Sequence, residues 1–337
     1  MINNIVSTVK KSSIYLLMVM TNILLITTIV YFIKITVTPF HLPIIFILSI
    51  IEYCILYKKE KWKEKLIPIV IGTVIFITSI IISSNVYDTT ADGNTYHKLA
   101  IGALKNGWNP SYESSRDFTK EKGNVFDVSD DNINALWVDH YAKATEIFAS
   151  VIYSFTNNIE SGKAYTLIFM YITFAIIGSY LYENKKMHWL IAFAISFIIA
   201  FNGITIVQIC NYYVDAVLML SLALILYSCF IISTNEDKNT RKETFIILAS
   251  SIIWCINAKF TGLAFSGLFC LAFYIYWLYI SYKKGKEVLK KDLITYTIFY
   301  TIVVIISIRN NWIFFIHKEL FRPWTSTVSI IWKRTCR

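Results

Sequence analysis

The chain has 337 residues, of which 56% are hydrophobic and only 16% are charged, and its mean hydropathy is +0.54. Soluble chains average about 25% charged residues, so this composition excludes an ordinary soluble protein and favours an integral membrane protein. The net charge of +10 would suit a nucleic-acid-binding protein, but the Lys and Arg residues are concentrated in short segments between apolar runs. That distribution excludes a nucleic-acid partner and favours membrane lipid as the surrounding medium.

Apolar runs of about 17–24 residues recur along the chain, and this is the length that crosses the core of a bilayer as a helix. We therefore predict an all-α, polytopic transmembrane helical bundle of about nine spans. The first run is too long for a cleavable signal peptide and is expected to act as an anchor. The predicted spans are Ser13–Phe40, His41–Tyr57, Leu66–Ser84, Gly162–Tyr182, Trp189–Phe201, Tyr213–Ile232, Thr244–Ile256, Gly262–Ile280 and Leu293–Ile308.

The short segments on one side of these spans are basic and hold roughly half of the 32 Lys and Arg residues. An excess of Lys and Arg in short loops is typical of the cytoplasmic side of a membrane protein. We therefore expect a multi-pass protein of the cell (plasma) membrane whose N-terminus is cytoplasmic. The basic segments are residues 10–11, 58–65, 185–186, 238–242 and 283–291.

This orientation divides the chain into spans one to three (1–84), a long acidic extracytoplasmic loop (85–161), spans four to nine (162–310) and an atypical basic tail (311–337). Within the long loop, His97–Asn106 and Asp139–Phe155 are predicted to be short amphipathic helices. The second is too short and too polar to span, so we expect it to lie along the membrane surface. Residues 107–132 are predicted to be a loop.

The clearest candidate for chemistry is the segment 87-YDTTADGNTYHK-98, directly after the third span. Asp88 and Asp92 lie four residues apart, and Tyr96 and His97 follow. Ionisable groups near the bilayer are costly and usually line a polar cavity, where a partly desolvated carboxylate can act as a general base on a hydroxyl. The alternative interpretation is a solvated loop with an Asp-Gly turn.

Three further segments place polar side chains on the same outer side. The segment 137-WVDHYAKATEIF-148 carries His140 and Lys143, which suit a phosphate or a sugar, although a helix anchored at headgroup depth explains it equally. Tyr213 and Asp215 stand where the sixth span begins. Lys259 interrupts an apolar hairpin and suits a lipid-linked phosphate, with snorkelling to the headgroups as the alternative.

Four segments resemble the C-type (GT-C fold) membrane glycosyltransferases, and among these the bacterial surface-polysaccharide members. They are 87-YDTTADGNTYH-97, 140-HYAKATEIFASVIYSFTNNIESGKA-164, 202-NGITIVQICNYYVDAVL-218 and 257-NAKFTGL-263. With their spacing they extend over about residues 85 to 310. Each motif alone is weak, and their order along the chain makes the resemblance moderately specific.

The resemblance implies transfer of a sugar, with inversion, from a polyprenyl-phosphate donor to a hydroxyl of a glycan or lipid-linked acceptor at the outer face. It implies that Asp92 or Asp88 is the catalytic base. Lys259, Lys143 and His97 are the residues expected to bind the donor phosphate. Some relatives use a divalent cation (Mg or Mn) and others none, and the sequence has no metal-ligand spacing beyond the Asp pair.

The chain departs from the family pattern at Ala142 and Gly203, where Pro is expected, and at Ala216, where Gly is expected. Family members also continue with more spans. The tail after residue 310 is basic on the predicted outer side, which suggests a frameshift and a C-terminally truncated chain. An active enzyme and an inactive truncated form both stay open, and resequencing the gene distinguishes them.

Two other functions fit a multispan protein. A surface-polysaccharide polymerase or ligase usually has its large outer loop late in the chain and depends on Arg there, whereas this loop is early and net acidic. A transporter usually has charged or Gly/Pro-broken spans near the midplane, and the spans here are nearly free of both. The pattern therefore favours the glycosyltransferase.

Overall fold

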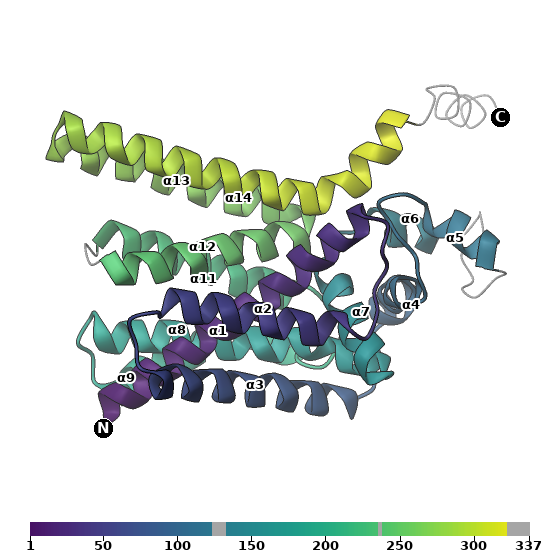
Figure 1. Cartoon of the computed structure of the whole chain (residues 1–337), viewed down its shortest axis with the longest axis horizontal. Helices are drawn as coiled ribbons and strands as arrows, with labels where there is room; N and C mark the ends of the chain where they lie inside the picture. The colour runs from purple at the N-terminus through teal and green to yellow at the C-terminus, as the bar shows by residue number, and fades with distance from the viewer. Residues whose placement is uncertain (123–132, 235–237, 322–337) are drawn as a thin grey trace.

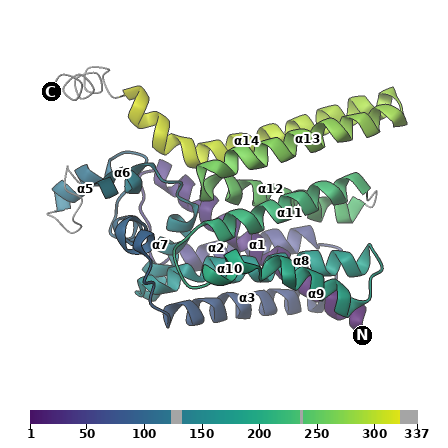
Figure 2. The same cartoon turned by 180° about the vertical axis from the view of Figure 1, so that it is seen from behind.

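The structure is a computed structural model that describes residues 1–122, 133–234 and 238–321. Every secondary-structure element assigned within these ranges is a helix, which confirms the predicted all-α class for the described part of the chain. Figure 1 shows the long helices running roughly alongside one another, with most of the short helices gathered at one end of the bundle. Seen from behind, α9 and α10 lie beside α8 and α11 (Figure 2).

Each predicted span overlaps one long helix. The first helix is displaced toward the N-terminus from its predicted span, because it begins at Ile2 and ends at Phe32, and Lys34 then adopts a left-handed backbone conformation with φ 63°. The long helices are α1 (Ile2–Phe32), α2 (His41–Leu56), α3 (Trp62–Ser84), α8 (Tyr165–Glu183), α9 (Trp189–Ala200), α11 (Asp215–Thr234), α12 (Lys238–Ala258), α13 (Phe260–Lys284) and α14 (Lys286–Phe321).

Within the described ranges, five helical segments are long and apolar enough to cross a membrane, namely Ile2–Phe32, Trp62–Ser84, Ile159–Glu183, Asp215–Thr234 and Phe260–Lys284. The helices α2 and α9 are also apolar but shorter. These lengths and compositions are compatible with a membrane protein.

The outer surface of α3 shows why water is an unsuitable medium for this bundle. Ile67, Val70, Val74, Ile77 and Ile81 recur every three or four residues and are each about half exposed. Side chains at this spacing form one continuous stripe on a helix. Soluble monomers rarely expose such large contiguous apolar patches, whereas lipid covers them without cost.

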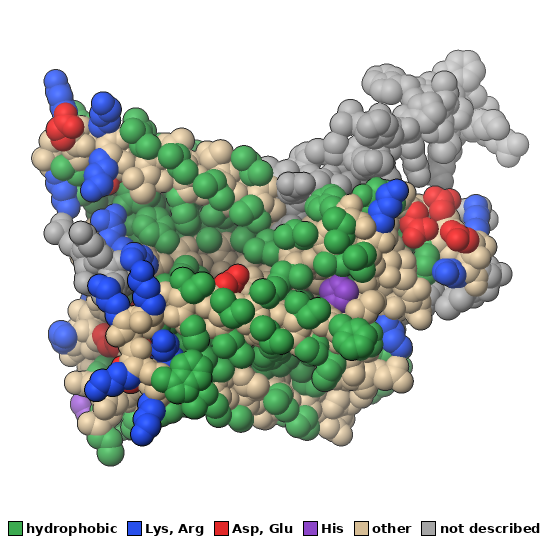
Figure 3. All heavy atoms as spheres, viewed as in Figure 1, with side chains coloured by type: hydrophobic (Ala, Val, Ile, Leu, Met, Phe, Trp, Pro, Cys, Tyr) green, Lys and Arg blue, Asp and Glu red, His purple; other side chains and the backbone are tan. Residues whose placement is uncertain are grey.

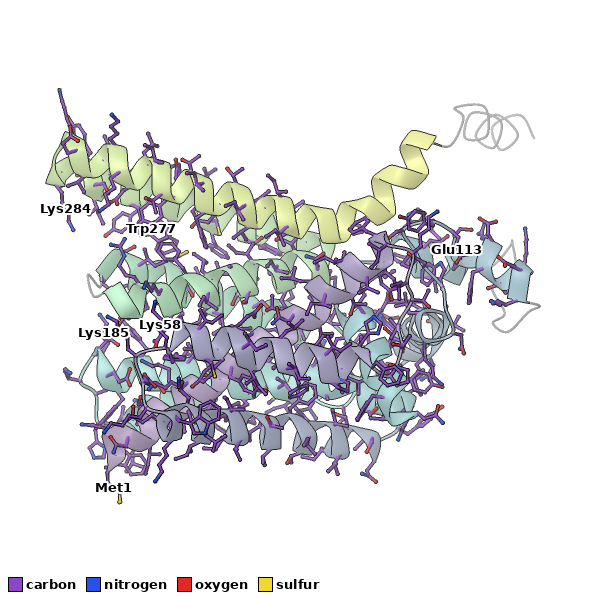
Figure 4. All side chains as sticks on the ribbon, in the orientation of Figure 1. Met1, Lys58, Glu113, Lys185, Trp277 and Lys284 are labelled. Atoms are coloured by element: carbon purple, nitrogen blue, oxygen red, sulfur yellow. The ribbon has the colours of Figure 1, made fainter. Side chains whose placement is uncertain are left out.

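Charge separates the two ends of the bundle. Hydrophobic side chains cover the middle of the face in Figure 3, and Lys and Arg gather at one end. Figure 4 labels Met1, Lys58, Lys185 and Lys284 at this basic end and Glu113 at the opposite end. We call these the basic end and the polar end.

Ion pairs connect the helices at the basic end. Lys10 on α1 lies 2.8 Å from Glu183 on α8 and 3.4 Å from Glu243 on α12, and Lys11 lies 2.6 Å from Glu60 in the α2–α3 turn. Each of these side chains is partly buried, so the pairs are less screened than surface pairs. The basic end therefore has a defined arrangement of helices as well as a positive charge.

The polar end is built from short elements: η1 (Gly93–His97), α4 (Lys98–Lys105), α5 (Ser115–Lys122), α6 (Ile133–His140), α7 (Ala144–Thr156), η2 (Ile159–Ala164) and, before α11, α10 (Gly203–Val207). The predicted helix at His97–Asn106 is confirmed as the last residue of η1 together with α4. The predicted loop at 107–132 is wrong in part, because α5 lies within it; residues 123–132 are outside the described ranges.

The predicted surface helix at Asp139–Phe155 is also corrected. The chain leaves the helix at residues 141–143, so two helices, α6 and α7, replace one. Every residue of α7 from Ala144 to Ile152 is buried, and α7 contacts α1, α4, α12 and η2. Small and apolar residues occur all round this helix, so it packs inside the bundle and does not lie on a membrane surface.

The turn between α12 and α13 depends on a glycine. A Cβ at Gly262 would lie 2.0 Å from the backbone oxygen of Cys255, whereas a Cβ at Gly267, on the same helix, would meet nothing within 4 Å. Real Cβ atoms do not approach a backbone oxygen so closely, so α12 and α13 would have to separate.

We therefore expect Gly262→Ala to destabilise the protein by about 1–3 kcal/mol, the usual cost of overpacking. Thermal unfolding of the purified protein in detergent measures this. Gly267→Ala is the matched control and should leave the midpoint unchanged or higher, because Ala favours a helix over Gly. Equal midpoints for the two variants would contradict the close approach.

Candidate functional site

Asp88 links two outer segments that are far apart in the sequence. Its side chain is buried, and one carboxylate oxygen accepts hydrogen bonds from the N–H and the hydroxyl of Thr90, both at 2.8 Å. The other oxygen accepts from the backbone N–H of Tyr212 at 2.9 Å. A general base has to come within hydrogen-bond reach of the proton that it takes, and a buried carboxylate that already accepts three hydrogen bonds is poorly placed for this. Asp88 therefore has the geometry of a positioning residue.

Gly93 allows the chain to pass directly over this carboxylate. A Cβ at this position would lie 2.1 Å from Oδ2 of Asp88 and 2.7 Å from Oγ1 of Thr90. The Asp-Gly pair noted in the sequence therefore reflects a close approach, with Gly93 as the first residue of the π-turn η1. Such turns are often found at functional sites.

Asp92 differs from Asp88 in exposure and in partners. Its side chain is half-buried, and its Oδ2 accepts a hydrogen bond from the Tyr96 hydroxyl at 2.9 Å. Burial raises the pKa of Tyr96, and the hydrogen bond to Asp92 raises it further. The phenol therefore stays protonated at neutral pH and donates to a carboxylate that is accessible from outside. Of the two predicted acids, Asp92 has the geometry of a base.

A buried charged cluster lies behind this pair. Glu146 on α7 places one oxygen 3.2 Å from Nδ1 of His97 and the other 2.9 Å from Nζ of Lys143. Lys143 also donates to the backbone oxygen of Tyr141 at 2.6 Å. Buried charges are stable only when they are paired in this way. His97 and Lys143, which the resemblance predicts to bind a donor phosphate, are enclosed and connect η1 to α7.

Tyr141, in the break between α6 and α7, shows that acids from three segments converge. Its ring lies 5.6 Å from the ring of Tyr96. Burial raises the pKa of Tyr141, and the nearby negative charges of Asp215, Glu146 and Asp92 raise it further. Helix α7, the start of α11 and the loop after α3 therefore meet around one tyrosine.

Lys259 and Asp215 form an open ion pair at this end. Nζ of Lys259, in the turn between α12 and α13, lies 2.6 Å from Oδ1 of Asp215 on the first turn of α11, and the two side chains are 36% and 42% exposed. Gln208 donates to the other Asp215 oxygen at 3.4 Å and accepts from the N–H of Ala216 at 2.7 Å. Unlike Lys143, Lys259 is accessible to an incoming anion.

The remaining predicted residues lie near this group. Tyr213 is half-buried, and its backbone oxygen accepts a hydrogen bond from the Tyr165 hydroxyl at 3.4 Å. His140 is half-buried at the end of α6, directly before Tyr141. Both therefore lie in the same two segments that bring Tyr141 and Asp215 together.

The sequence analysis missed a second buried cluster, centred on Glu160. This carboxylate lies 2.6 Å from Nζ of Lys98 and 2.6 Å from Nζ of Lys163, and it accepts from the N–H of Asp88 at 3.1 Å. Lys163 is fully buried and also donates to the backbone oxygen of Val86. The sequence feature that could have indicated this cluster is the i,i+3 spacing of Glu160 and Lys163 at the start of a predicted span, where unpaired charges are costly.

The described residues do not form a metal site. Among them, no three His, Cys, Asp or Glu side chains gather closely enough to hold a metal ion. Both oxygens of Asp88 accept hydrogen bonds from Thr90 and Tyr212, so Asp88 and Asp92 do not share a ligand position. These residues therefore do not fit the divalent cation that some C-type glycosyltransferases use.

Comparisons of the chain with protein-family models, with curated proteins and with solved structures found no match.

We expect Asp88 to contribute to the stability of the fold and Asp92 to contribute little to it. Asp88→Ala leaves the N–H groups of Thr90 and Tyr212 without their acceptor, and each unsatisfied buried donor costs about 1–3 kcal/mol. We expect a clear loss of thermal stability in detergent for Asp88→Ala and little change for Asp92→Ala, whose side chain is half exposed. A similar loss in both variants would contradict the positioning role of Asp88.

Proposed function

We propose that this protein is a multispan glycosyltransferase of the plasma membrane. It transfers a sugar from a polyprenyl-phosphate donor to a hydroxyl of a cell-surface glycan or lipid-linked acceptor on the outer side. The observation that carries the proposal is the state of Asp92. It is an accessible carboxylate, held by a buried tyrosine, at the end of an apolar bundle opposite its basic end.

The proposed reaction is a direct displacement at the anomeric carbon. Asp92 takes the proton of the acceptor hydroxyl as that oxygen forms a bond to the anomeric carbon. The bond from this carbon to the phosphate oxygen breaks, and polyprenyl phosphate leaves with the electron pair. A positioned base of this kind contributes about 10²–10⁴-fold to the rate. The hydrogen bond from Tyr96 orients Asp92 so that its second oxygen faces the acceptor.

Lys259 is the residue proposed to bind the leaving phosphate. Its side chain is more exposed than those of His97 and Lys143, the other two cationic candidates. Its partner Asp215 keeps it at the start of α11. A cation beside the leaving group stabilises the negative charge that develops there. The donor's isoprenoid chain would lie along the apolar surface of the bundle, so its phosphate would reach the polar end from the membrane.

Three lines support the proposal together. The four segments that resemble the C-type glycosyltransferases contain Asp92, Asp215 and Lys259, and they also contain the buried Glu146, Glu160 and Lys163. In the part of the chain that the structure describes, five helices are long and apolar enough to span a membrane. The basic and polar ends lie at opposite ends of those helices (Figure 4), as the charge rule for an outward-facing site requires.

The proposal predicts the orientation of the chain. In a variant lacking its native cysteines, Glu121→Cys on α5 should react with a membrane-impermeant maleimide added to intact cells. Lys61→Cys, at the basic end, should react only after the cells are permeabilised. The reverse pattern would place the Asp92 cluster in the cytoplasm and reject transfer at the outer face.

The proposal also predicts that Asp92→Asn abolishes transfer, because the amide cannot accept the acceptor's proton. We expect at least about a hundredfold loss of radiolabelled sugar transfer from polyprenyl-phosphate sugars in isolated membranes. Membrane insertion, followed by the same maleimide labelling, should survive.

Glu121→Gln is the matched control, since it removes an exposed acid from the same outer loop without touching the Asp92 cluster. It should retain wild-type transfer. Normal transfer by Asp92→Asn would reject Asp92 as the base. No transfer by the wild-type chain with any donor tested would reject the activity itself for a chain that ends at Arg337.

A further inference from the structure

A pocket at the basic end has no part in the proposed transfer. It has a volume of about 320 Å³ and lies between the pair α13/α14 and the helices α11 and α12. Figure 1 shows these two pairs side by side, and Figure 4 labels Trp277 and Lys284 toward the basic end of α13. All four helices contribute to the lining, so the pocket is a feature of how they pack.

The lining is positively charged. Arg241 from α12, Lys284 from α13 and Lys291 from α14 all contribute to it. Asp292 is the only acidic residue among the described lining residues, and it accepts a hydrogen bond from Ser281 at 2.6 Å. Three cations against one carboxylate give the described lining a net positive charge, which attracts an anion. The charge of the pocket therefore calls for an anionic ligand.

The rest of the lining is aromatic and aliphatic. The rings of Trp277 and Tyr296 stack at 4.6 Å with an angle of 27° between their planes, and the Tyr296 hydroxyl accepts a hydrogen bond from Arg241. Ile232 and Ile280 add apolar surface. A free inorganic anion has no apolar part that could contact such a lining, whereas the glycerol and upper acyl chain of a lipid would contact it.

The neighbouring surface indicates that lipid has access to the pocket. Tyr276, Tyr279 and Tyr282 on α13 are 50%, 54% and 65% exposed. Tyrosine and tryptophan are enriched where a membrane protein meets the lipid headgroups. The last turns of α13 therefore lie at headgroup depth, and a phosphate at this depth is within reach of Arg241 and Lys291.

We propose that this pocket binds the phosphate of an anionic glycerophospholipid headgroup. Arg241 and Lys291 contact the phosphate, because an arginine fork and a lysine point charge are the usual phosphate ligands. Trp277 and Ile280 contact the glycerol and acyl part. Basic pockets between membrane helices are a known type of lipid site. This inference does not rest on the proposed transfer, since Asp92 lies at the opposite end.

The test measures binding of phosphatidylglycerol to the full-length protein by native mass spectrometry from detergent, with phosphatidylcholine as the zwitterionic competitor. The wild type should retain phosphatidylglycerol in preference to phosphatidylcholine. Lys291→Gln and Arg241→Gln should each weaken that binding about fivefold, the effect of roughly one basic residue at an anionic membrane surface. Equal retention of the two lipids by the wild type would overturn the proposal.

Lys290→Gln is the matched control. Lys290 is exposed on α14 beside Lys291 and carries the same charge, but it does not line the pocket. It should change the binding by less than about twofold, because an exposed charge outside the pocket is screened. Equal losses for Lys290→Gln and Lys291→Gln would show general charge attraction and reject a defined site.

A further measurement distinguishes the phosphate of a lipid from free inorganic phosphate. Inorganic phosphate at millimolar concentration should not displace phosphatidylglycerol from the wild type. Displacement would reassign the pocket to a free phosphate and overturn the lipid proposal. Unfolding temperatures in detergent identify a variant that loses binding only because it misfolds. If Arg241→Gln misfolds, the result for Lys291→Gln decides whether the proposal holds, because Lys291 is exposed and its replacement is not expected to disturb the fold.

Discussion

The polar end of this protein depends on the hydrogen bonds of Asp88. Its carboxylate accepts from Thr90 and from the backbone of Tyr212, and its own N–H donates to Glu160. These bonds connect the segment after α3 to the segment before α11 and to the start of η2. A buried carboxylate retains its charge only where donors surround it, so the three segments have to keep these positions for the bundle to close.

The Glu146 and Glu160 clusters extend the same constraint. Each carboxylate is buried and contacts two basic side chains, one from its own segment and one from the loop that follows α3. Removing either carboxylate would leave the buried Lys143 or Lys163 without its oppositely charged partner, which costs far more than a surface pair contributes. The buried pairs therefore order the segment after α3, whereas Asp92, Asp215 and Lys259 keep partly exposed side chains.

The two ends of the bundle carry different kinds of charge. At the basic end, Lys and Arg predominate and meet acids in partly buried pairs such as Lys10 with Glu183. At the polar end, acids and bases alternate within buried clusters. Between them, apolar helix faces such as that of α3 suit lipid. This separation places the Asp92 cluster and the basic pocket lined by Arg241 and Lys291 at opposite ends of the bundle.

The amino-acid sequence by itself determined the helical class, because runs of apolar residues near bilayer length can satisfy their backbone groups only as helices. It also determined which segments are basic. It did not separate Asp88 from Asp92, since two acids four residues apart look alike until their partners are known. It placed the segment of α7 on a surface, because local spacing does not tell a fully buried helix from an interfacial one.

Only the tertiary structure decided those points. Asp88 became a positioning residue because Tyr212, 124 residues away in the sequence, donates to it. Lys143 became an enclosed partner of Glu146, and Glu160 gained Lys98 from another segment. The physical reason is common to all of them: burial and pairing set what a charged side chain can do, and both arise from segments that are distant in the sequence.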